Sequence, residues 1–149
     1  MVDRDLIIAK AASVRAHLDR IAAKAGADLQ VFMRDLDRQD VVSFNLHLAV
    51  ENCIDIAAHI ISENGWGVPG SASEMFYLLE DRGLLTPELT ERMIKAVGLR
   101  NLIVHEYGKI DLSLLFATVR NNLNDLNSYL SNIFKKLDIL PWSPHKSKK

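Results

Sequence analysis

The stretch "DVVSFNLHLAVENCIDIAAHII", from Asp40 to Ile61, decides the fold class of this chain. Its apolar residues recur every three to four positions, which is the period of an α-helix that buries one face. We predict a long helix that begins between Asp37 and Asp40 and runs to Glu63, just before Asn64-Gly65. The predicted buried face consists of Val41, Phe44, Leu48, Val50, Ile54, Ala57, Ala58 and Ile61.

The same helical period continues on both sides of this stretch, and we find no convincing strand. Further helices are expected over residues 3–25, 28–36, 71–83, 86–108 and 111–137. Ser71 with Glu74 forms a capping box, and Thr86-Pro87 supplies a cap followed by a first-turn proline. The predicted fold class is all-α, an antiparallel bundle of about five to six helices. It forms one domain over residues 1–137, followed by a disordered basic tail over 138–149 that ends in "HKSKK".

Composition limits the classes of protein to which the chain can belong. Its 149 residues carry a formal net charge of −1, so no overall basic field favours nucleic acid or membrane. Any contact with RNA phosphates must therefore come from a local cluster. The one cysteine, Cys53, excludes an internal disulfide and a cysteine-rich zinc site. No signal peptide and no apolar run of the roughly 18 residues that a membrane span needs is found. We expect a soluble, cytoplasmic protein without a membrane partner.

The stretch "RNLIVHEYG", from Arg100 to Gly108, places four polar residues inside an apolar helical segment. At about 100° per residue, Tyr107 lies about −20°, Asn101 about 100° and His105 about 140° from Arg100. One interpretation is a solvated helix face on which His105 hydrogen-bonds Asn101. The other is a site that cleaves a phosphodiester without metal, because histidine transfers protons near neutral pH and arginine stabilises phosphorane charge. The spacing alone leaves both interpretations open.

The motif also carries a family resemblance. "RNLIVHEY" fits Arg-x4-His-x-Tyr with a polar residue directly after the arginine, and in this respect the chain resembles HEPN-domain ribonucleases. More closely, it is similar to the HepT-type toxins encoded beside minimal nucleotidyltransferases. The resemblance extends from Asp3 to about Leu137 and includes Asp40–Ile61 and the Gly- and Pro-containing loop before "EMFYLL" (Glu74–Leu79).

The resemblance implies both a function and a set of partners. It implies a metal-independent endoribonuclease toxin of a type VII-like toxin–antitoxin pair, with no cofactor and with its cleft at a homodimer interface. Arg100 and His105 would be catalytic, and Asn101 would support them at the RNA substrate. Tyr107 would receive AMP from a cognate minimal nucleotidyltransferase (MntA-like) antitoxin, which silences the toxin. A higher hetero-oligomer with the antitoxin is compatible with this assignment.

Two other functions remain open at this point. The first is a non-catalytic helical module that uses the same residues to bind a nucleotidyltransferase or RNA. The second is a metal-binding bundle built on Asp55 and His59, whose i, i+4 spacing puts them on one helix face. No third ligand accompanies them, so we predict no metal site. We interpret them as a structural hydrogen-bonded pair, with cleft-lining residues as the alternative.

The remaining polar and aromatic residues favour structural interpretations. The chain cannot itself be the nucleotidyltransferase, because "DLD" (Asp35–Asp37) precedes the only Gly-Ser pair, Gly70-Ser71. His17 and His47 lie near apolar stripes and are interpreted as packing or surface residues. Trp66 is interpreted as a packing residue of its loop rather than a platform for base stacking.

Overall fold

The computed structural model describes residues 1–139, 142 and 143 of the chain. These residues form seven α-helices and one short 3₁₀ helix, with no strand among them, which confirms the all-α prediction. The helices are α1 (Arg4–Ala25), α2 (Leu29–Arg34), α3 (Leu36–Asn64), α4 (Ala72–Asp81), α5 (Pro87–His105), the 3₁₀ helix η1 (Tyr107–Lys109), α6 (Leu112–Asn121) and α7 (Asn124–Lys136).

Side-chain caps fix where most of these helices begin. A helix leaves its first N–H groups without partners, and a short polar side chain can accept hydrogen bonds from them. Caps of this kind come from Asp3, Asp28, Asp35, Ser71, Thr86 and Asp111. The capping box is confirmed in its first half, since Ser71 Oγ accepts from the Glu74 N–H at 3.1 Å. The Glu74 carboxylate reaches back to the N–H of Gly70.

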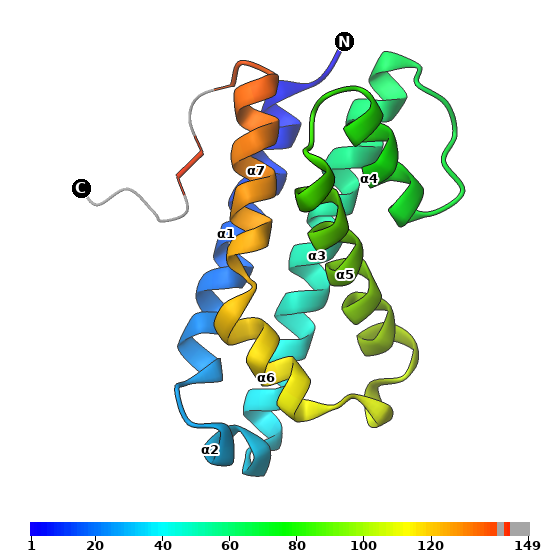
Figure 1. The fold of residues 1–149 in the computed structure, drawn as a ribbon. Coiled ribbons are helices and arrows are strands. Elements are labelled where there is room, and N and C mark those ends of the chain that lie inside the picture. Colours follow the sequence, from blue (N-terminus) through cyan, green and yellow to red (C-terminus); the bar gives the residue numbers. More distant parts are fainter. Residues whose placement is uncertain (140–141, 144–149) are drawn as a thin grey trace, which may run out of the picture.

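Helix α3 is the centre of the bundle. Figure 1 shows α1, α3, α5 and the α6–α7 pair running alternately in opposite directions along the molecule. Helix α3 packs against α1, α2, α4, α5 and α7. It is the one helix in the described part of the chain that is long and apolar enough to cross a membrane. Since 56% of that apolar window is buried inside the bundle, α3 is arranged like the core helix of a soluble protein.

The buried face of α3 is broader than the sequence pattern predicted. Fully buried positions include Val42, Leu46, Ala49, Cys53, Ile56 and Ile60, none of which belongs to the predicted face. Phe44 was predicted to be buried, but 60% of it is exposed. A helix surrounded by neighbours buries most of its circumference, so a single stripe captured only part of the core.

Two predicted helices are shorter than expected. The last one is interrupted at Asn122 and Leu123, which separate α6 from α7. The motif helix ends at His105 instead of Gly108, because Glu106 leaves the helical conformation (φ −142°, ψ 43°). Tyr107 therefore begins η1, and its predicted angle of −20° from Arg100 is wrong. The chain has to reverse direction between α5 and α6, and residues 106–111 make this turn (Figure 1).

Part of the segment expected to be disordered packs on the bundle. Ile139 is buried, and the Trp142 ring meets Phe134 edge-on with centroids 5.5 Å apart. Trp142 Nε1 also donates to Asn127 Oδ1 at 3.1 Å. The "HKSKK" end of the predicted tail lies outside the described residues.

Candidate functional site

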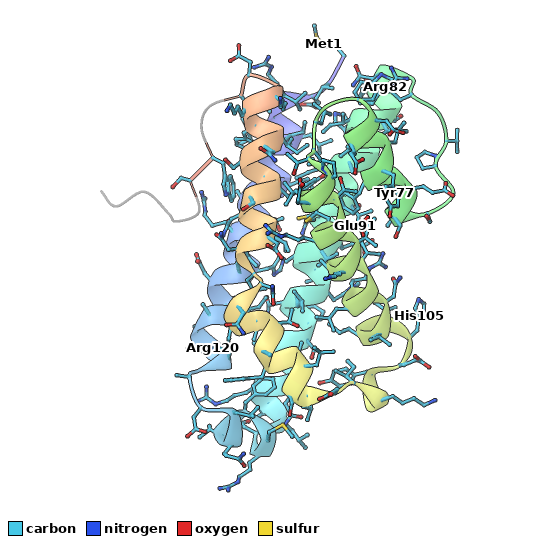
Figure 2. The ribbon with its side chains drawn as sticks, viewed as in Figure 1. Met1, Tyr77, Arg82, Glu91, His105 and Arg120 are labelled. Carbon is cyan, nitrogen blue, oxygen red and sulfur yellow. The ribbon has the colours of Figure 1, made fainter. Side chains whose placement is uncertain are left out.

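The motif lies where α5 leaves the core. Leu89, Thr90, Met93 and Val97 in the first part of the helix are buried, whereas no residue after Val97 is. Figure 2 shows His105 at the outer side of the last turn of α5. The motif side chains therefore lie on the last turns of α5 and just beyond its end, and the buried residues that hold this helix in the bundle all lie before them.

Arg100 faces inward, toward α3. Its side chain is only 18% exposed, and Nη1 lies 3.5 Å from Oε2 of Glu51. The buried Nε of Arg100 and Oε2 of Glu51 have no hydrogen-bond partner among the described residues. A guanidinium has five N–H donors in a rigid fork. The Glu51 pair holds one arm of this fork, which leaves donors free for an anion.

Asn101 and His105 lie on the outside of the helix. Both are exposed, and neither side chain hydrogen-bonds another described residue. The hydrogen bond that one interpretation placed between them is therefore not formed. The helical positions of Arg100 and His105 still differ by about 140°, because both precede the end of α5. Within one protomer these two side chains do not converge on a common point.

Tyr107 faces the first turns of α3. Its hydroxyl donates a hydrogen bond to Oδ1 of Asp40, and 41% of the residue is exposed. Partial burial raises the pKa of the Tyr107 phenol, and the hydrogen bond to the Asp40 carboxylate raises it further, with the Ser43 hydroxyl acting in the opposite direction. The phenol is thus fixed in its protonated form while remaining accessible.

A polar stripe on α3 joins the two ends of the motif, and sequence reasoning missed it. We define the α3 stripe as Asp40, Ser43, His47 and Glu51, which follow one another at intervals of three or four residues. Asp40 accepts from Tyr107, and Glu51 pairs with Arg100. Between them, His47 Nδ1 is buried without a hydrogen-bond partner among the described residues, and the buried Ser43 hydroxyl acts on the Tyr107 phenol, whose pKa it lowers. Buried polar atoms without partners are uncommon in folded proteins, and each one requires an explanation. The polar spacing on an apolar helix was the available signal.

Asp55 and His59 do not form the predicted pair. Asp55 Oδ2 accepts from Lys10 Nζ at 3.0 Å, and His59 Nε2 accepts from the Asp3 N–H at 2.9 Å. Both contacts tie α3 to α1, on a different side from the motif residues. The described residues hold no group of three or more His, Cys, Asp or Glu side chains that could bind a metal ion. Neither residue gains a third ligand from the fold.

The remaining candidates have structural environments. His17 Nδ1 lies 2.8 Å from Oδ1 of Asn45, in a contact between α1 and α3. The Arg82 guanidinium lies 5.0 Å from the centre of the Trp66 ring, and Trp66 packs partly against the core. Burial raises the pKa of the Cys53 thiol, so this cysteine stays protonated.

A separate groove runs between α5, α6 and α7. It has a volume of about 470 Å³ and an apolar floor that includes Leu46, Leu99, Leu102 and Leu126. Arg92 and Lys95 lie at its edge. The groove takes residues from the same helix as the motif, but Arg100, Asn101, His105 and Tyr107 do not line it.

Comparison with known proteins adds independent information about this arrangement. The family model described as "HepT-like: Ribonuclease HepT-like" matches residues 14–133. An mRNA nuclease HepT of Shewanella oneidensis is 36% identical over 129 residues, which cover 87% of this chain and 96% of that protein. A tRNA nuclease HepT of Aphanizomenon flos-aquae is 30% identical over 129 residues, covering 82% and 88%. Among solved structures, a tri-AMPylated Shewanella oneidensis HEPN toxin in complex with MNT antitoxin matches with a TM-score of 0.82 at 35% identity, over 88% of this chain and 98% of that chain.

Proposed function

Because this chain belongs to the HepT-like ribonuclease family, we propose that it is an endoribonuclease toxin whose partner is a minimal nucleotidyltransferase antitoxin. The observation that carries this proposal is the ion pair between Arg100 and Glu51 of α3. Arg100 lies on α5, the helix that also carries His105. A guanidinium with free donors and an exposed imidazole are the two groups that cleavage of a phosphodiester requires.

The chemistry needs no metal in this proposal. The imidazole of His105 takes the proton from a ribose 2′-hydroxyl, and the 2′-oxygen attacks the adjacent phosphorus. Negative charge then grows on the phosphate oxygens, where the free donors of Arg100 stabilise it. Asn101 contributes a further amide donor on the exposed side of α5. The 5′-oxygen leaves with a proton from an imidazole in its acid form.

A second copy of the chain completes the site in this proposal. Arg100 and His105 point in different directions within one protomer, so the pair needs a partner helix across a two-fold axis to form one cleft. The surface around the motif supports such a contact, since Leu102, Val104 and Leu114 are each at least 40% exposed. Pairing these apolar side chains in a homodimer would remove them from water.

Silencing follows from modification of Tyr107. An AMP group on this phenol adds bulk and negative charge at the Asp40 end of the α3 stripe, on the surface along which RNA would have to bind. Like charges repel, so the modified protein loses affinity for RNA. The tri-AMPylated toxin in the related complex supports this route of control.

The decisive experiment incubates the purified protein with total RNA in the presence of EDTA. We expect cleavage by the wild type and a loss of at least about 10²-fold in Arg100→Ala and in His105→Ala, as for removal of a general base or an oxyanion donor. Arg92→Ala is the matched control, because Arg92 lies two turns earlier on α5 and pairs with Asp125 at 3.8 Å. Full activity in His105→Ala would contradict the catalytic assignment.

The same preparation separates the enzyme from the non-catalytic module. Size-exclusion chromatography with light scattering gives the oligomeric state, and a dimer is expected. A wild-type dimer that binds the antitoxin yet cuts no RNA would establish the module instead. Cleavage that disappears on EDTA treatment would overturn the metal-independent mechanism alone.

A further inference from the structure

Two exposed tyrosines of this chain donate hydrogen bonds to carboxylates. Tyr107 on η1 donates to Asp40 of α3, and Tyr77 on α4 donates to Glu91 of α5 at 3.0 Å. Figure 2 shows Tyr77 and Glu91 close together on neighbouring helices. The two pairs are chemically alike, but only Tyr107 lies within the motif. This similarity provides an internal control for any role assigned to the Asp40 contact.

We propose that Asp40 is the base that takes the phenolic proton of Tyr107 when this tyrosine is AMPylated, so that the toxin supplies part of the catalytic apparatus for its own silencing. The inference rests on the proposed function, which makes Tyr107 the acceptor of AMP. The antitoxin contributes the co-reactant, a magnesium-bound ATP.

The transfer is a substitution at the α-phosphorus of ATP. The Tyr107 phenol oxygen forms a bond to the α-phosphorus of ATP. The bond between that phosphorus and the oxygen bridging to the β-phosphorus breaks, and its electron pair leaves with pyrophosphate. The phenolic proton passes along the existing hydrogen bond to Oδ1 of Asp40, which later releases it to water. The step involves no oxidation or reduction, so it needs no oxidant or reductant.

The phenol needs a base for this reaction. Burial and the Asp40 hydrogen bond both raise the pKa of Tyr107, so almost none of it is phenolate at neutral pH. A neutral phenol is a poor nucleophile until its proton is removed. A positioned base that removes the proton as the new bond forms accelerates such steps by typically 10² to 10⁴-fold. Asp40 already occupies the position of that base.

Among the described residues, Asp40 is the one carboxylate that is hydrogen-bonded to the Tyr107 hydroxyl. Ser43 is the other α3 side chain that acts on the phenol, and a serine hydroxyl is no base at neutral pH. Glu51 is committed to Arg100 further along the stripe, and Glu106 pairs with Lys109 at 3.9 Å within the turn. His105 is exposed and makes no hydrogen bond to Tyr107 among the described residues. Asp40 and Tyr107 are themselves both exposed, so a nucleotide can approach the phenol oxygen.

The test compares Asp40→Asn with the wild type. Asparagine has nearly the same shape and its side-chain oxygen still accepts the phenolic hydrogen bond, but it cannot take the proton. The probe is a purified minimal nucleotidyltransferase antitoxin, supplied with ATP and Mg²⁺. Mass spectrometry of the Tyr107 peptide over time gives the rate of the first AMP addition.

We expect AMP addition to Asp40→Asn to be about 10²-fold slower than to the wild type. Its rate should rise roughly tenfold per pH unit between pH 7 and 9, because the reaction then depends on the phenolate fraction. The wild-type rate should change far less over this range. Asp40→Glu retains a carboxylate and should recover part of the rate. Glu91→Gln makes the same kind of change at the Tyr77 pair, and Tyr107 in this variant should receive AMP at the wild-type rate.

The outcomes separate the inference from the proposed function. If Asp40→Asn, folded by circular dichroism, is modified within about twofold of the wild-type rate and with the same pH dependence, Asp40 only positions the tyrosine and the inference fails. If wild-type Tyr107 receives no AMP, the proposed route of silencing fails and the inference with it. Cleavage of RNA by the unmodified protein is measured separately and does not depend on either result.

Discussion

The two halves of α5 have the same secondary structure but differ in burial. Residues 87–97 are capped by Thr86 and bury Leu89, Thr90, Met93 and Val97 against the bundle. Residues 98–105 bury no residue fully, and they place Arg100 inward and His105 outward. The first half anchors the helix, which allows the second half to hold the motif side chains at its free end. Stability and activity should therefore respond to different halves of one helix.

The largest expected effect is the loss of unfolding free energy in Met93→Ala, which is compared with the His105→Ala variant described above. Met93 is fully buried, and removal of such a side chain from a core costs about 2–5 kcal/mol of unfolding free energy. Urea denaturation measures this loss. Met33→Ala is the matched control, since Met33 of α2 is exposed and its truncation should change stability by no more than about 0.5 kcal/mol.

The comparison fails if the two halves are not separable. Under conditions where Met93→Ala remains folded, its RNA cleavage per folded molecule should equal that of the wild type. His105→Ala should show the reverse, with unchanged urea unfolding and lost cleavage. A His105→Ala variant that unfolds as readily as Met93→Ala would show that the free end of α5 also supports the fold.

A smaller effect on activity is expected for Glu51→Gln, which tests what holds Arg100 in place. The amide keeps the shape of the side chain but removes the charge that pairs with Nη1 across 3.5 Å. Arg100 then loses its fixed orientation, and we expect RNA cleavage to fall about tenfold, or about 1.4 kcal/mol in activation free energy. Glu63→Gln is the control on the same helix, because Glu63 pairs with the N-terminal amine at 3.2 Å. An unchanged rate in Glu51→Gln would exclude a positioning role for this carboxylate.

The sequence predicted features that depend on neighbouring residues, such as helix starts. It did not predict features that depend on how separate helices pack together. Helix starts at Asp3, Ser71 and Thr86 are set by the cap and the residues two or three positions later, so they could be predicted. The end of α5 depends on the turn into α6, which a periodicity argument extended by three residues. Phe44 was misplaced for a similar reason, since the buried circumference of α3 depends on how many neighbours surround it.

The candidate site shows the same limit. Arg100, Asn101, His105 and Tyr107 could be proposed as site residues because they lie within eight consecutive positions and match a family pattern. Their α3 partners were not, because the Tyr107–Asp40 hydrogen bond joins residues 67 positions apart in the chain. Which residues of α3 face α5 depends on how two long helices are set against each other, and one sequence does not determine that register. Asp55 and His59 were correctly placed on one helix but face α1.

The smallest predicted effect concerns a third tyrosine, Tyr129 of α7, which contrasts with Tyr107 because it lies entirely in the core. Its hydroxyl donates to the Cys53 carbonyl of α3 at 2.9 Å, and burial raises its pKa well above the ordinary value. In the unfolded chain the phenol ionises near pH 10, while in the folded protein it keeps its proton. The folded state then binds more protons than the unfolded state, so unfolding free energy falls as pH rises above about 10.

Tyr129→Phe separates the hydrogen bond from this pH dependence. At neutral pH we expect a loss of about 0.5–1.5 kcal/mol from the missing hydrogen bond, measured by urea denaturation. Above pH 10 the slope of stability against pH should be shallower in Tyr129→Phe than in the wild type. The buried Cys53 thiol, whose pKa is also raised, adds a slope that begins at lower pH and is shared by both proteins. Tyr77→Phe removes an exposed phenol and should alter the slope less. If the slope of unfolding free energy against pH above pH 10 were equal in Tyr129→Phe and the wild type, the Tyr129 phenol would be accessible to water in the folded protein. The core between α3 and α7 would then be less well packed than the buried first half of α5.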